Sequence, residues 1–83
     1  MECHVTVKVR DGLHARPAAV FVKTASEAGV PVTIAARGQS PVPASSILAV
    51  MGLGVRCGDT VTLSSESANA LGALEEILST VGL

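Results

Sequence analysis

Aromatic side chains are almost missing from this chain: Phe21 stands alone, with no tryptophan or tyrosine among 83 residues. Basic residues are few, six in all, and scattered, and the formal net charge is −1. A protein that binds nucleic acid needs clustered Lys and Arg for the phosphates, and aromatic rings to stack on bases. We therefore expect no nucleic-acid partner.

Long hydrophobic runs are also absent. The longest apolar stretch, residues 17–22, is far shorter than the ~20 residues that cross a bilayer as a helix. The first residues lack the basic segment and hydrophobic run of a signal peptide. With 48% hydrophobic and 16% charged residues, the chain is too apolar to be disordered. We expect a cytoplasmic protein with no membrane insertion.

Cysteine is scarce: Cys3 and Cys57 form neither a disulfide framework nor a C-x-x-C pair. Two free thiols in a reducing cytosol are the simpler interpretation. Cys3 beside His4 raises the idea of a metal site, but neighbouring side chains of a strand point to opposite faces. We expect no metal and no cofactor.

The hydrophobic spacing predicts seven elements in the order βαββαβα. The expected strands cover residues 3–10, 30–36, a short stretch from 42, and 60–64, and the expected helices cover 15–28, 46–52 and 67–81. Pro43 is expected to block regular pairing, and Gly72 to allow a close packing contact inside the last helix. Strands with one apolar face and helices with one apolar stripe favour a two-layer α+β fold, here a single domain over residues 1–83.

His14 is the candidate for chemistry. Pro17 suits the first turn of a helix, so His14 lies at or near the N-cap, beside unpaired N–H groups and the positive end of the helix dipole. A phosphoryl group is favoured there, and Arg16 adds a charged fork that matches phosphate geometry. The alternatives are an ordinary N-cap histidine and a solvated arginine. A positive charge at the start of a helix is mildly unfavourable, which favours a functional reason for the presence of Arg16.

Two further features stand near helix starts. Ser46 is a good N-cap on chemical grounds alone, because its hydroxyl can accept from a first-turn N–H. Ala19 and Val20 lie partly off the buried stripe of the first helix. They form either an exposed apolar patch beside His14 or the margin of the core.

The segment around His14 resembles the active-site signature of the HPr family, the histidine-containing phosphocarriers of the bacterial sugar phosphotransferase system. It reads Gly12-Leu13-His14-Ala15-Arg16-Pro17-Ala18. Residues 44–54, around Ser46, resemble the serine-containing helix of the same family. The resemblance extends from Val5 to the last helix and implies a four-stranded antiparallel sheet with three helices on one face.

The resemblance also implies a function. The δ1 nitrogen of His14 would accept a phosphoryl group from phosphorylated enzyme I, with phosphoenolpyruvate as ultimate donor, while Arg16 stabilises the phosphate. His14 would then pass the group to enzyme IIA components during sugar uptake. The chain would be a stoichiometric carrier and not an enzyme, and we expect a monomer.

Regulation and docking follow from the same resemblance. In the Gram-positive branch the serine matching Ser46 is phosphorylated by an ATP-dependent kinase and meets regulatory proteins, but here Ser45 stands where a lysine often precedes it. The expected docking residues are Ala19, Val20, Ile47, Leu48 and Met51. Ile47 and Met51, one helical turn apart, are alternatively core residues.

Other functions remain open from the residues. The chain is alternatively a regulatory binding module of the same fold, or a carrier in a nitrogen-regulatory or dihydroxyacetone-kinase branch. An independent enzyme has little support, since Asp11 and Asp59 are the only aspartates available for a Ser-His-Asp arrangement.

Overall fold

The computed structural model describes residues 1–82, which fold in the predicted order βαββαβα. The strands are β1 (Glu2–Thr6), β2 (Val32–Ala36), β3 (Val42–Pro43) and β4 (Thr60–Ser65), and the helices are α1 (Ala15–Ser26), α2 (Ile47–Gly52) and α3 (Ala68–Ser79). Within this part of the chain, no helix has both the length and the apolar character needed to span a membrane.

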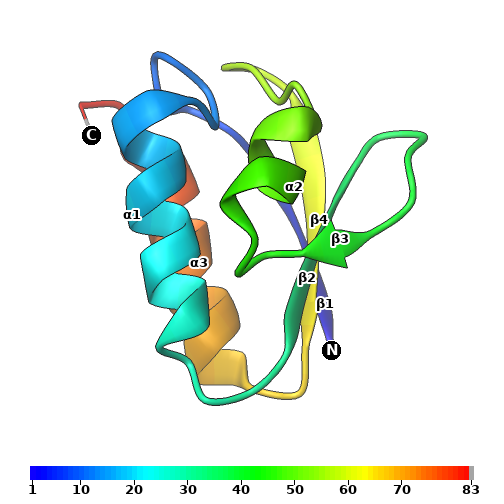
Figure 1. Cartoon of the computed structure of the whole chain (residues 1–83). Helices are drawn as coiled ribbons and strands as arrows, with labels where there is room; N and C mark the ends of the chain where they lie inside the picture. Colours follow the sequence, from blue (N-terminus) through cyan, green and yellow to red (C-terminus); the bar gives the residue numbers. More distant parts are fainter. Residues whose placement is uncertain (83) are drawn as a thin grey trace.

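The four strands form one antiparallel sheet in the order β1-β4-β2-β3. All three helices cover the same face of that sheet, with α1 and α3 side by side (Figure 1). The predicted two-layer α+β fold is confirmed. The other face of the sheet is left open, and most of its side chains are polar, as His4, Thr60 and Thr62 illustrate.

The core lies between the sheet and the helices. Strand alternation turns Val5, Ile34 and Leu63 toward the helices, where each is at most 3% exposed. Phe21 of α1 and Leu74 of α3 meet them and are fully buried. Each such side chain contributes about 1.5–3 kcal/mol by leaving water, so the inward face predicted from the alternation is the one that holds the layers together.

The first strand is shorter than predicted. β1 ends at Thr6, yet Val7 and Val9 are as buried as the strand valines. The backbone beyond Thr6 takes other partners: the Val7 N–H donates to the Asp59 carbonyl at 2.8 Å, and the Lys8 N–H donates to the Leu78 carbonyl at 2.7 Å. Alternation of apolar residues therefore predicted burial correctly but overestimated strand pairing.

Other boundaries move by a few residues. α1 ends at Ser26 instead of residue 28, ahead of Gly29 at a φ of +75°, and α3 ends at Ser79 instead of 81. Pro43 does pair, opposite Thr33, so the expectation that it blocks pairing is wrong. β3 is an edge strand, where a proline can leave its donor-free side unpaired.

Gly72 also differs from its prediction. A Cβ built on it meets nothing within 4 Å, and the residue lies on the exposed side of α3. The buried stripe of that helix consists of Ala70, Leu71, Leu74 and Leu78. The expected close packing contact at Gly72 is wrong, because the packed face lies on the other side of the helix.

Candidate functional site

His14 is the N-cap residue of α1, with extended backbone angles (φ −144°, ψ 153°). Its ring makes no capping hydrogen bond, and the side chain is exposed. Buried neighbours fix the segment on both sides: Leu13 is 2% exposed before it, and Pro17 and Ala18 are buried after it. The imidazole is therefore presented to solvent from a fixed backbone and is not used to cap the helix.

The backbone around His14 is unusual. Gly12 has a φ of +67°, and Ala15 has a φ of +51°, the one non-glycine with a positive φ among residues 1–82. For an L-residue this conformation costs roughly 1–2 kcal/mol. Strain held by the surrounding structure often accompanies functional positions, and here it lies between His14 and Arg16.

The loop after α2 packs against the segment that precedes His14. The Leu13 N–H donates to the Val55 carbonyl at 3.1 Å, and the Gly12 N–H to the Val9 carbonyl at 3.0 Å. Gly12 also lies against the backbone of residues 55 and 56, where a Cβ would approach the Arg56 Cα to 2.8 Å. The loop after α2 and the loop before α1 are thus packed against each other, next to the segment that carries His14.

The charge at this helix start favours an anion. The first turn of α1 contains no acidic residue, and its leading N–H groups have no partner within the helix. Arg16 is exposed in the same turn. A dianionic phosphoryl group on the His14 ring would meet the helix dipole, free donors and a guanidinium together.

An exposed apolar surface borders the site. Leu48 is 81% exposed, Ile47 38% and Met51 36%, all on α2, which packs beside α1 (Figure 1). On α1, Ala19 is exposed and Val20 half-buried. The core-facing alternative for Ile47 and Met51 is wrong, since both keep over a third of their surface in solvent, and Val50 is the residue of α2 that enters the core.

Ser46 is the N-cap of α2, and its hydroxyl oxygen accepts from the Ala49 N–H at 3.3 Å. The capping role expected from its side chain is confirmed. The residue is half-buried, whereas Ser45 before it is exposed.

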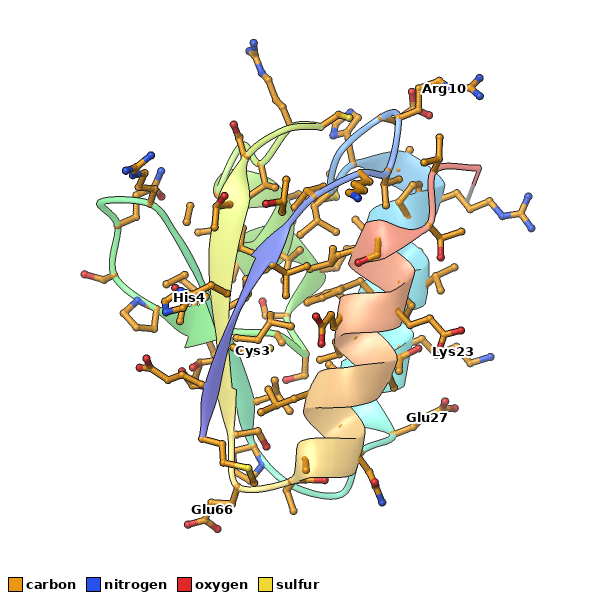
Figure 2. The ribbon with its side chains drawn as sticks, turned by 180° about the vertical axis from the view of Figure 1, so that it is seen from behind. Cys3, His4, Arg10, Lys23, Glu27 and Glu66 are labelled. Carbon is orange, nitrogen blue, oxygen red and sulfur yellow. The ribbon has the colours of Figure 1, made fainter. Side chains whose placement is uncertain are left out.

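Cys3 and His4 do not come together. Figure 2 shows Cys3 turned toward α3 and His4 turned to the opposite side of the sheet. The His4 Nδ1 lies 3.0 Å from the Thr62 hydroxyl, while burial, and then the Glu75 carboxylate, raise the pKa of the Cys3 thiol. Cys3 and Cys57 are both free. Across residues 1–82, no three His, Cys, Asp or Glu side chains gather in a way that could hold a metal ion.

Comparison with known proteins decides the family. The model of the PTS-HPr family, described as the PTS HPr component phosphorylation site, matches residues 1–82. The chain belongs to the HPr family of phosphocarriers. It is 50% identical over 76 residues to the phosphocarrier protein HPr of Streptomyces coelicolor, covering 92% of this chain and 82% of that one.

Two further HPr proteins extend the likeness. The phosphocarrier protein HPr of Haloferax volcanii is 49% identical over 84 residues, with 96% of this chain and 94% of the relative covered. The crystal structure of HPr from Bacillus anthracis superposes with a TM-score of 0.88 at 33% identity, covering 94% of this chain and 95% of the other. The family resemblance, the fold and the phosphocarrier function predicted from the sequence are confirmed.

Two features of the site escaped sequence reasoning. The positive φ of Ala15 could not be predicted from the sequence, because alanine normally avoids that conformation. The contact of Gly12 with Arg56 joins residues far apart in the chain. The one sequence feature that could have indicated this contact is Gly12 itself, because a residue without a side chain allows another backbone to approach closely.

Proposed function

We propose that His14 is the phosphoryl acceptor of this HPr-family chain, and that its δ1 nitrogen forms the phosphohistidine. The proposal is supported by the state of the imidazole, which is exposed, makes no capping hydrogen bond and lies at the positive end of α1. The nitrogen lone pair forms the new P–N bond, and the bond from phosphorus to the donor breaks, with its electron pair staying on the donor. No further reactant is needed.

The donor we propose is enzyme I charged from phosphoenolpyruvate, and the acceptors are enzyme IIA components, all in the cytoplasm. Arg16 and the first-turn N–H groups spread the charge of the phosphoryl group during transfer, where positioning and charge stabilisation do most of the work. Because the phosphoryl group arrives and leaves through the same histidine, the chain acts as a stoichiometric carrier.

The apolar surface of α1 and α2 would dock these partners. Ala19, Val20, Ile47, Leu48 and Met51 are exposed or half-buried beside the helix that bears His14. Apolar groups at the centre of an interface are where binding energy concentrates. Leu48, the most exposed of the three on α2, is the residue whose truncation should weaken docking most.

The test uses the two histidines of the chain. The protein is incubated with enzyme I and phosphoenolpyruvate, and acid-labile, base-stable phosphate is measured by mass spectrometry. Wild type and His4→Ala should gain one phosphate, and His14→Ala should gain none. A His14→Ala protein that gains as much phosphate as wild type would refute the assignment, and so would a wild type that gains none.

We also propose regulatory phosphorylation at Ser46. Its hydroxyl sits at the start of α2, next to exposed Ile47 and Leu48. A phosphate there carries about −1.5 to −2 charge and would disturb docking on an apolar surface. Incubation with ATP and the serine kinase should modify wild type and Ser45→Ala but not Ser46→Ala. An unmodified wild type would remove the proposal.

A further inference from the structure

Arg56 stands next to the segment that holds His14, although it is distant in sequence. The Leu13 N–H donates to the carbonyl of the preceding residue, Val55, at 3.1 Å. A Cβ on Gly12 would lie only 2.8 Å from the Arg56 Cα. The backbone of Arg56 is therefore held against a residue two positions before His14.

The loop that carries Arg56 is itself well fixed. Val55 is 4% exposed, and the Gly58 N–H donates to the Val7 carbonyl at 2.7 Å. The Arg56 N–H donates to the Asp59 carboxylate at 2.9 Å, and the Asp59 N–H donates back to the Arg56 carbonyl at 3.0 Å. This turn uses the backbone of Arg56, while its side chain is exposed. The guanidinium thus extends into solvent from a rigid origin.

The charges of the molecule are unevenly placed. Arg16 and Arg56 stand at the His14 end, and Figure 2 shows Arg10 at that end too, with Glu27 and Glu66 toward the opposite one. Asp11 and Asp59 also lie at this end and offset part of the positive charge; the Asp59 carboxylate accepts from the Arg56 N–H and keeps its own negative charge. The field at this end attracts anions, and at physiological salt it acts over a Debye length of about 8 Å.

We infer that Arg56 steers and holds the dianionic phosphoryl group that a partner protein brings to His14. The inference rests on the proposed role of His14. Any donor protein must bring its phosphoryl group to His14. The Arg56 guanidinium, at the edge of the same site, would attract that negative charge as the donor approaches. Such a cation raises the rate of association more than the rate of the chemical step.

The test is rapid-quench measurement of phosphoryl transfer from phosphorylated enzyme I. Arg56→Gln should lower the second-order rate constant about three- to tenfold at low ionic strength, with the gap closing as salt screens the charge. The maximal rate at saturating carrier should stay within about twofold of wild type, because Arg56 does not supply the attacking group. Arg56→Lys should keep most of the rate.

Lys23→Gln is the matched control. It removes one positive charge from the last turn of α1, at the end of the helix opposite to His14, and Figure 2 shows Lys23 on the side of the molecule toward Glu27. An Arg56→Gln protein with wild-type rate constants at low salt overturns the inference. A loss that Lys23→Gln reproduces also overturns it, since net charge alone would then explain the effect.

A second variant guards against a folding artefact. Arg56→Met keeps the aliphatic stem and must show the same loss and salt dependence as Arg56→Gln, with a thermal midpoint near that of wild type. If the steering role is wrong, every Arg56 variant still gains acid-labile phosphate on His14 at the wild-type rate. If the His14 assignment is wrong, wild type itself gains no phosphate there, so the two failures are distinct.

Discussion

Gly12 and Arg56 meet backbone to backbone, and the contact leaves no room for a side chain at Gly12. A Cβ there would lie 2.8 Å from the Arg56 Cα and closer still to the Val55 carbonyl oxygen, at a φ of +67°. Gly12→Ala should therefore lower the free energy of unfolding by about 3 kcal/mol or more, because backbone strain and steric overlap add. Urea denaturation measures the loss.

Gly38→Ala is the control for that change. Its φ is +76°, but a Cβ at Gly38 meets nothing within 4 Å. It should lose only the conformational cost, roughly 1–2 kcal/mol. Equal losses for the two variants would contradict the close contact between the Gly12 and Arg56 backbones.

Ala15→Gly tests the strain beside His14. Glycine adopts a φ of +51° without steric cost, so the variant should be as stable as wild type or more stable by up to about 1 kcal/mol. Phosphoryl transfer to His14 should slow about two- to tenfold, because a freer backbone holds the imidazole less firmly. Transfer kinetics and thermal unfolding, measured on one preparation, separate these two effects. A variant that is less stable than wild type, or that transfers phosphate at the wild-type rate, would contradict the prediction.

The parts of the site that depend on local chemistry were predictable. A proline in the first turn and an apolar run after it place His14 at the N-cap, and the hydroxyl of Ser46 makes it a cap wherever a helix begins. Both placements follow from a few neighbouring residues. For the same reason, strand alternation was enough to identify the buried face of the sheet.

The rest depends on contacts between distant segments. Nothing near Arg56 in the sequence indicates that its backbone lies against Gly12. Val7 and Val9 alternate like strand residues, but the long-range bonds of Val7 and Lys8 to Asp59 and Leu78 replace regular pairing. Ile47 and Met51 have helical spacing that fits either core or surface, and only the placement of α2 on α1 decides between them.

Gly72 offers a site for stabilisation. It lies inside α3 with open space where a Cβ would stand. Gly72→Ala should raise the free energy of unfolding by about 1 kcal/mol, since alanine has the higher helix propensity. Gly29→Ala, equally open but at a φ of +75°, should lower it by roughly 1–2 kcal/mol. Chemical denaturation of both variants checks the pair; a Gly72→Ala protein less stable than wild type would mean that this face of α3 is in contact.

The two thiols should differ in reactivity with iodoacetamide. Cys57 is exposed and Cys3 half-buried, and burial, followed by the Glu75 carboxylate, raises the pKa of Cys3. Because the thiolate is the reacting form, a raised pKa lowers the thiolate fraction at a given pH. Peptide mass spectrometry at pH 8 should find Cys57 alkylated first, and Cys3 should need a higher pH. Glu75→Gln should lower the pH midpoint of Cys3 alkylation only partly, since burial is the larger cause.

Urea provides the control, because it exposes both thiols and their alkylation rates should then converge. If Cys3 reacted as fast as Cys57 in the native protein, the packing of Cys3 beneath α3 would be wrong.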